Sequence, residues 1–255
     1  MLRILLLLLL STAFFCCSTP ETDREKFTWK GKKIVWTGTT TPWQYDTKSY
    51  PNQIGKLLET EMFNTSVANS RIAFRAKDTE GVGLEGLSGT YAELIASGYA
   101  QNFSYENKII PYLKDPYNAD VVVIDHGQND AELLESRPGT IDSRDKSTFY
   151  GAFNSVIDAI QKQNPKCKII LCTPPNGYVY GGVEPFVSRF RILRSAILAI
   201  GYSRKLPVWD MMSRSGITAG NVSVWTNNDL YPNQTMTDSL AKDGYTFFSS
   251  IDFNL

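Results

Sequence analysis

The sequence predicts an α/β protein with a central parallel sheet and helices on both faces of the sheet. Two observations support this prediction. Short runs rich in β-branched residues recur along the chain, and segments with apolar residues at helical spacing lie between them. The chain has 255 residues, of which 42% are hydrophobic, and its sequence shows neither a repeat nor a low-complexity linker. These features predict one doubly wound domain.

The first half of the domain is expected to contain two strands and two helices. Residues 33–37 form a β-branched and aromatic run that ends at a glycine and a run of threonines, as expected of a strand. Residues 51–61 are predicted to be a helix, because Pro51 suits a first turn and the apolar positions 54, 57, 58 and 62 share one helical face. A short second strand is predicted at residues 66–69 and a further helix at residues 87–101.

The second half of the domain continues the alternation. Residues 121–124 are entirely apolar, which is typical of a central strand buried on both faces. The remaining predicted elements are a helix at 149–163, a strand at 167–172, a helix at 186–200, a strand at 207–209 and a closing helix at 238–250. Parallel sheets bind ligands beyond the carboxyl ends of their strands. We therefore expect the site in the loops that follow the strands, together with the loop at residues 225–233.

The content of charged residues, histidine and cysteine argues against several classes of function. The chain has 26 basic and 26 acidic residues, and its longest basic run is Lys30–Lys33, so no nucleic-acid partner is expected. The chain has one histidine and no cluster of cysteines, so we expect no bound metal and no other cofactor. Cys167 and Cys172 lie on one predicted strand at an odd separation and so face opposite sides, which predicts packed free thiols.

The amino terminus differs in kind from the rest of the chain. A charged start at Met1–Arg3, an apolar stretch at residues 4–10 and a following pair of cysteines predict a signal peptide over residues 1–17. The apolar stretch is shorter than the roughly 20 residues of a membrane-spanning helix. The segment resembles a bacterial lipoprotein signal, and that resemblance implies lipidation of Cys17. Plain secretion without a lipid is the alternative.

Export sets the expected organisation of the whole chain. We expect a flexible leader at residues 18–30, followed by a single domain at residues 31–255. A lipid on Cys17 would hold the protein at a membrane, either in the bacterial periplasm or on the cell surface.

The apolar run at residues 121–124 continues into Asp125 and the turn His126-Gly-Gln-Asn-Asp130. A turn of this kind at the end of a buried strand presents hydrogen-bond donors to a substrate. The donors here would be the side-chain amide of Asn129 and the backbone N–H of Gly127.

This turn and three other segments resemble the motif blocks of the SGNH (GDSL-type) hydrolases. The other segments are Lys33–Trp43 with its Gly38-Thr39-Thr40, Asn69 at the predicted end of the second strand, and Asn228–Asn233. The resemblance implies a three-layer, flavodoxin-like fold and the hydrolysis of esters of lipids, acylated sugars and other carbohydrates. It also implies an oxyanion hole. Its donors would be Asn129 and the backbone at Gly38, Ala73 and Gly127.

All three catalytic positions of this family are changed in the chain. Thr40 stands at the position of the nucleophilic serine, Asn228 at that of the aspartate and Tyr231 at that of the histidine. The extra methyl group of threonine stiffens χ1 and crowds an approaching acyl group. A tyrosine with a pKa near 10 is a poor base, and an asparagine carries no charge to stabilise a protonated base.

Two functions are therefore open from the sequence. In the first, the protein has little or no catalytic activity and binds a carbohydrate or acylated small molecule. Trp43, Tyr45 and Trp225 would line the cleft, although such rings can equally pack loops onto a sheet. In the second, the protein is an esterase in which His126, the only histidine, serves Thr40 as the base. A His126 ring nitrogen within about 3.5 Å of the Thr40 hydroxyl would favour the esterase, whereas a bond to a neighbouring loop would indicate that His126 shapes the turn.

Overall fold

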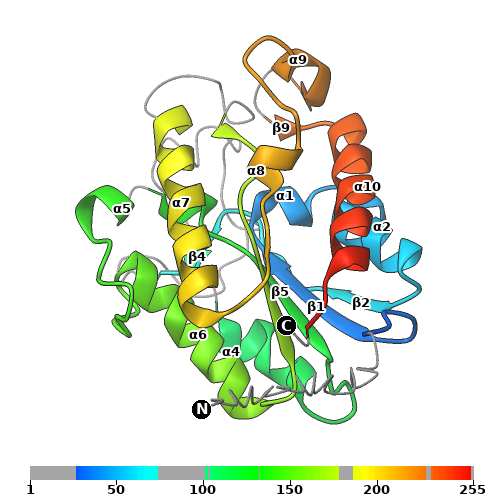
Figure 1. Cartoon of the computed structure of the whole chain (residues 1–255), viewed down its shortest axis with the longest axis vertical. Helices are drawn as coiled ribbons and strands as arrows, with labels where there is room; N and C mark the ends of the chain where they lie inside the picture. Colours follow the sequence, from blue (N-terminus) through cyan, green and yellow to red (C-terminus); the bar gives the residue numbers. More distant parts are fainter. Residues whose placement is uncertain are drawn as a thin grey trace, which may run out of the picture.

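Five parallel strands form the central sheet of the computed structural model, in the order β2-β1-β5-β6-β7 (Figure 1). The structure describes residues 27–73, 101–102, 104–131, 133–177, 186–227 and 231–253. The strands are β1 Lys33–Gly38, β2 Glu61–Asn64, β5 Val121–Asp125, β6 Lys168–Cys172 and β7 Val208–Trp209. This order is that of flavodoxin-like sheets, so the predicted fold class is confirmed.

The two central strands are buried along their whole length. Val35 of β1 lies opposite Val122 of β5, and Val123 of β5 lies opposite Ile170 of β6. All four side chains are inaccessible to solvent. Apolar residues occupy successive positions because helices cover both faces of the sheet.

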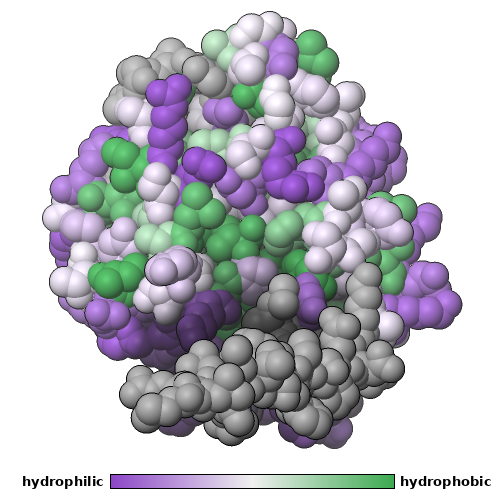
Figure 2. All heavy atoms as spheres, in the orientation of Figure 1, coloured by the Kyte–Doolittle hydropathy of each residue, from purple (hydrophilic) through white to green (hydrophobic). Residues whose placement is uncertain are grey.

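Two pairs of long helices cover the two faces of the sheet and lie on opposite sides of it in Figure 1. One face packs against α6 Phe149–Gln163 and α7 Phe186–Arg204, and the other against α2 Tyr50–Leu57 and α10 Gln234–Ser250. Each pair encloses its own hydrophobic cluster with the sheet. Figure 2 shows apolar residues at the centre of one face of the molecule, between α7 and α10, with hydrophilic residues around them.

Short elements connect these layers. The short helices are α1 Thr40–Trp43, α4 Tyr105–Lys108, α5 Leu133–Ser136, α8 Met211–Arg214 and α9 Val222–Trp225. The 3-10 turns are η1 Asp46–Lys48, η3 Ile110–Leu113 and η4 Gln128–Asp130. The minor strands are β3 Ser70–Arg71, β4 Gln101–Asn102, β8 Thr226–Asn227 and β9 Tyr231–Pro232. The pair β3-β4 is parallel and the pair β8-β9 is antiparallel.

The second strand lies earlier in the sequence than predicted. Helix α2 ends at Leu57, so Glu61–Asn64 forms β2 and the prediction of a strand at residues 66–69 was wrong. Gly55 lets α2 approach β2 closely, because a Cβ there would lie 2.8 Å from Cβ of Met62. Residues 65–67 continue alongside β1 without forming a strand, because Thr65 and Val67 donate their N–H groups to carbonyl groups of β1.

Capping residues account for the ends of two other helices. The predicted bounds of α6 are confirmed, and its first turn is capped by the Thr148 hydroxyl, which accepts from the Gly151 N–H. Helix α10 begins at Gln234 rather than at the predicted residue 238, because the Asn233 side chain accepts from the Met236 N–H. Helix α7 runs on to Arg204, past its predicted end.

The described chain begins with residues that belong to the core. Trp29 is 8% exposed, and its indole N–H donates to the carbonyl of Phe248 at 2.8 Å. The Phe27 ring contacts that of Phe253, with centroids 4.8 Å apart. The folded part therefore includes residues 27–30, which the sequence assigned to the leader. The predicted signal peptide, Cys17 and residues 87–100 of the second predicted helix lie outside the described residues, whereas Gln101 belongs to β4.

Cys167, which precedes β6, and Cys172, its last residue, are buried free thiols on opposite faces, as predicted. Cys167 packs in the cluster under α6 and α7, and Cys172 packs in the cluster under α2 and α10. Burial raises the pKa of Cys167 to about 12 and that of Cys172 well above its ordinary value. Among the helices that the structure describes, none combines the length and the apolar character needed to cross a membrane.

Candidate functional site

The candidate site lies where β1 and β5 end side by side, with Gly38 opposite Asp125. A Cβ on Gly38 would lie 2.3 Å from Cγ of Pro42 and 2.7 Å from the carbonyl oxygen of Asp125. Glycine is therefore required for the chain to turn over the end of β5. The turn places Thr39 before α1 and Thr40 at its first residue.

Thr40 is held in the wall of the site. Thr40 is only 7% exposed, and its hydroxyl oxygen accepts a hydrogen bond from the backbone N–H of Asn69 at 3.0 Å. Asn69 presents this N–H from a left-handed conformation, with φ 57°. The bond engages one lone pair of the oxygen that would have to attack an ester carbonyl.

Asn129 donates both of its side-chain amide hydrogens within the protein. One bond reaches the Thr39 hydroxyl at 2.6 Å, and the other reaches the carbonyl of Ser70 at 2.9 Å. Gly127 enables the turn with φ 113°, a conformation that a side chain would strain. The amide thus ties the end of β5 to the end of β1 and to β3. The sequence did not single out Thr39 or Ser70, because their roles depend on this contact.

The predicted backbone donor at Ala73 is also engaged. Ala73 and Ile72 donate their N–H groups to the two carboxylate oxygens of Asp130, each at 3.0 Å. Asp130 itself is inaccessible to solvent. Ala73 therefore anchors the segment after β3 to the turn.

His126 is buried beside the end of β1, where its ring contacts Thr37. Its side chain is inaccessible, and Nε2 lies 3.2 Å from the hydroxyl of Thr37. Burial lowers the pKa of His126 to about 3. A group with this pKa takes up a proton poorly near neutral pH, so the geometry and the pKa both argue against general-base catalysis.

Asp125 is a buried titratable group that the sequence did not single out. Its carboxylate accepts a short hydrogen bond from Tyr50 and bonds at 3.3 Å from Trp36 Nε1 and Gln128 Nε2. Burial raises the pKa of Asp125 to about 6, although these three donors lower it. The signal in the sequence is an aspartate that ends an otherwise apolar strand. Its function here is to join α2 and η4 to the end of the sheet.

The last motif segment is described only in part. Asn228 lies outside the described residues, and Tyr231 is placed by its backbone in β9, paired with Asn227 of β8. The Tyr45 hydroxyl donates to the carbonyl of Pro232 at 2.9 Å and accepts from Asn227 at 3.1 Å. Tyr45 therefore ties the segment after α1 to the β8-β9 hairpin.

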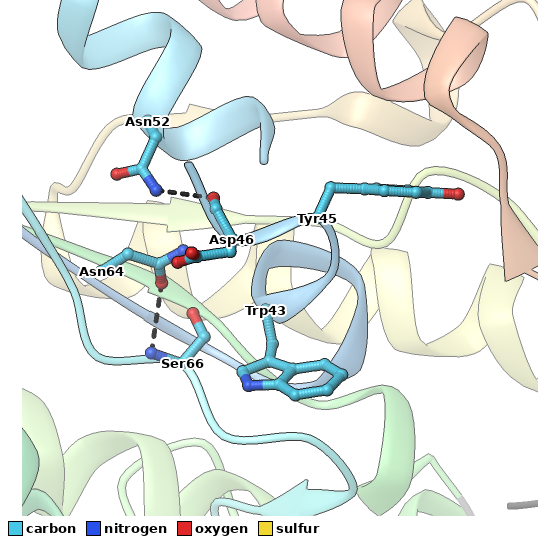
Figure 3. Close-up of a pocket in the computed structure, with 6 residues that line it drawn as sticks. All are labelled: Trp43, Tyr45, Asp46, Asn52, Asn64 and Ser66. Carbon is cyan, nitrogen blue, oxygen red and sulfur yellow. Dashed lines mark hydrogen bonds between the residues drawn. The ribbon is translucent and has the colours of Figure 1, made fainter. Parts of the chain in front are cut away.

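A pocket of about 600 Å³ opens beside α1 (Figure 3). The described residues that line it are Trp43, Tyr45, Asp46, Asn52, Asn64 and Ser66. Two of the three expected ligand-lining aromatic residues are thus brought together. The third, Trp225, is half-buried and packs against the core cluster under α2 and α10. Thr40, His126 and Asn129 are not among these lining residues, so the pocket flanks the motif residues. Within the described ranges, no group of three His, Cys, Asp or Glu side chains could hold a metal ion.

Comparison with known proteins identifies the fold through structure alone. Neither a protein-family model nor a curated protein sequence matches the chain. A lipase/acylhydrolase from Enterococcus faecalis superposes with a TM-score of 0.53 at 16% identity, over 84% of this chain and 94% of the other. A catalytic mutant of an acetylxylan esterase from Geobacillus stearothermophilus gives 0.53 at 13% identity, over 86% and 94%. A GDSL-like lipase from Parabacteroides merdae gives 0.55 at 13% identity, over 88% and 98%. The chain therefore has the fold of the SGNH (GDSL-type) hydrolases.

Proposed function

We propose that this protein binds a carbohydrate or acylated small molecule in its inherited cleft and does not hydrolyse it. The observation that carries the proposal is the use of both Asn129 amide hydrogens by Thr39 and Ser70. An oxyanion hole works by donors that are already aimed at the developing negative charge. Removing one such donor slows enzymes by about 10²- to 10³-fold.

The other groups near Thr40 support the same proposal. The Thr40 oxygen accepts from a backbone N–H, and the His126 imidazole contacts Thr37 and has a pKa of about 3. The Thr40 oxygen therefore has a positioned partner, and the single imidazole of the chain contacts a different threonine. Ester hydrolysis needs both a base and a stabilised oxyanion.

The proposal predicts that turnover will not depend on Thr40. We expect the purified protein to hydrolyse a short-chain aryl ester and acetylated xylo-oligosaccharides no faster than its Thr40→Ala variant. Thr39→Ala serves as the matched control, because it removes the neighbouring hydroxyl. Circular dichroism would confirm that each variant is folded. Hydrolysis by the unsubstituted protein that disappears in Thr40→Ala would contradict the proposal and support an esterase that uses Thr40.

We also propose that the protein is exported and held at a membrane by a lipid on Cys17. The support is the charged start, the apolar stretch and the cysteine pair at the amino terminus. In a bacterial host, Cys17→Ser should move the protein from the membrane fraction to the aqueous fraction and abolish labelling with a radioactive fatty acid. Cys16→Ser should change neither. Membrane association that survives Cys17→Ser would reject this anchor.

A further inference from the structure

We infer that the pocket beside α1 holds an uncharged saccharide ring. The inference deepens the proposed function and rests on it for the idea that the ligand is a carbohydrate. It places the sugar against Trp43, Asp46 and Ser66, on the β2 side of α1, and not on the Thr40 hydroxyl. The pocket volume of about 600 Å³ is in the range of small-molecule sites.

Trp43 supplies an aromatic surface for the sugar. Its side chain is 52% exposed although it is large and apolar, and it lines the pocket from the last residue of α1. Figure 3 shows the indole at one side of the pocket, near Ser66. By contrast, Trp29, Trp36 and Trp209 are buried, and their indole N–H groups are bonded within the protein. The C–H face of a sugar ring would cover the exposed surface of Trp43.

Ser66 supplies a buried polar group to the pocket. Its hydroxyl oxygen is shielded from solvent and has no hydrogen-bond partner in the part of the chain that the structure describes. Figure 3 shows this hydroxyl turned towards Asp46 and Asn64. Asn64 fixes its position, because Oδ1 accepts from the Ser66 N–H at 3.2 Å while Nδ2 donates to Pro42 at 2.8 Å. Buried hydroxyl groups are nearly always bonded, so we expect the Ser66 side chain to rotate into the pocket and bond with a sugar hydroxyl when the ligand binds.

Asp46 reaches the pocket through an uncommon backbone conformation. Tyr45 and Asp46 are successive non-glycine residues with positive φ, 66° and 44°. Two contacts hold them. The Tyr45 hydroxyl donates to Pro232, and Asn52 Nδ2 donates to the Asp46 carbonyl at 2.8 Å. Such strain is kept where the surrounding structure enforces it and is often found at binding sites.

The charge of the pocket selects among sugars. Asp46 is the only charged residue among the described residues that line it. Its carboxylate can accept hydrogen bonds from two sugar hydroxyls, and it repels a carboxylate or phosphate on the ligand. The ligand class is therefore a neutral saccharide, and repulsion weakens the binding of uronates and sugar phosphates.

The five tryptophans allow a test that locates the ligand. In ¹⁵N NMR spectra of the full chain titrated with xylotetraose or cellotetraose, we expect the Trp43 indole signal to shift in a saturable way. Trp43→Phe assigns this signal. By calorimetry, Trp43→Ala should weaken binding at least tenfold, and tetragalacturonate should bind at least tenfold more weakly than the neutral sugars. Asp46→Asn should reduce that discrimination. Tyr202→Ala, which removes an aromatic residue 91% exposed on α7, should bind as the unsubstituted protein does.

The outcomes separate this inference from the proposed function. Shifts confined to another indole, unchanged binding by Trp43→Ala, or no binding of either neutral sugar at millimolar concentration would overturn the inference. An acylated ligand bound elsewhere would then still satisfy the proposed function. Conversely, hydrolysis that depends on Thr40 would reject the proposed function, while a saturable Trp43 shift would still support a saccharide in this pocket.

Discussion

Asp125→Asn and His126→Gln are expected to change the pH dependence of stability in opposite directions. Burial raises the pKa of Asp125 to about 6, so the folded state favours its protonated form. The stabilisation from Asp125 is complete below its ordinary pKa near 4 and is lost as the pH rises through about 6. Burial lowers the pKa of His126 to about 3. The stabilisation from His126 is complete above its ordinary pKa of 6.5 and is lost as the pH falls towards 3.

These two contributions oppose each other between pH 6 and pH 4. Each changes the free energy of unfolding by about 1.4 kcal/mol per pH unit, so they cancel in the unsubstituted protein. Relative to that protein, Asp125→Asn should lose about 3 kcal/mol as the pH falls from 6 to 4, and His126→Gln should gain about 3 kcal/mol. Urea unfolding at pH 4, 5, 6 and 7 measures these changes.

The double variant is the control for this pair. With both titrating groups removed, its free energy of unfolding should change between pH 6 and pH 4 by the same amount as that of the unsubstituted protein. Asp125 contacts Trp36 and Tyr50, whereas His126 contacts Thr37. The two side chains therefore titrate in separate environments on opposite faces of the sheet. Parallel pH profiles for the two single variants would show that burial does not control these pKa values.

Gly38→Ala should destabilise the protein by about 3 kcal/mol or more, because the added Cβ meets the backbone of β5. That atom would lie 2.7 Å from the Asp125 carbonyl oxygen and 2.3 Å from Cγ of Pro42, and the strand cannot move aside cheaply. Urea unfolding at pH 7 measures the loss, and failure of the variant to accumulate as folded protein is the extreme form of the same effect.

Gly220→Ala is the matched control for this prediction. Gly220 is exposed, and the nearest atom to an added Cβ is the Thr218 hydroxyl oxygen at 3.8 Å. The same substitution there should change stability by no more than about 0.5 kcal/mol. Equal effects at both positions would contradict the steric explanation.

The parts of the fold that could be predicted are those governed by burial on both faces. The strands at Val121–Asp125 and Lys168–Cys172 are apolar at successive positions because helices cover the sheet on both sides. The second strand could not be located in this way. Met62 continues the helical spacing of α2 but belongs to β2, where Gly55 permits close packing against it.

The sequence predicts where the candidate residues lie but not which atoms they contact. Residue types and chain order placed Thr40, Asn129 and the segment after β8 near one edge of the sheet. The partners of each group are decided by atoms distant in sequence. The Asn129 amide donates to Thr39 and Ser70. The Ala73 N–H donates to Asp130, and the His126 ring forms a hydrogen bond with Thr37.

The sequence by itself determined the doubly wound sheet and the changed nucleophile position, because hydrophobic patterning and residue identity are local properties. The tertiary structure alone decided that Asn129 is an internal donor, that the His126 ring is buried against Thr37, and that a pocket opens at Trp43 and Asp46 beside the motif residues. Hydrogen-bond partners, burial and the resulting pKa values depend on which segments meet in space, and these meetings follow from the packing of the whole chain.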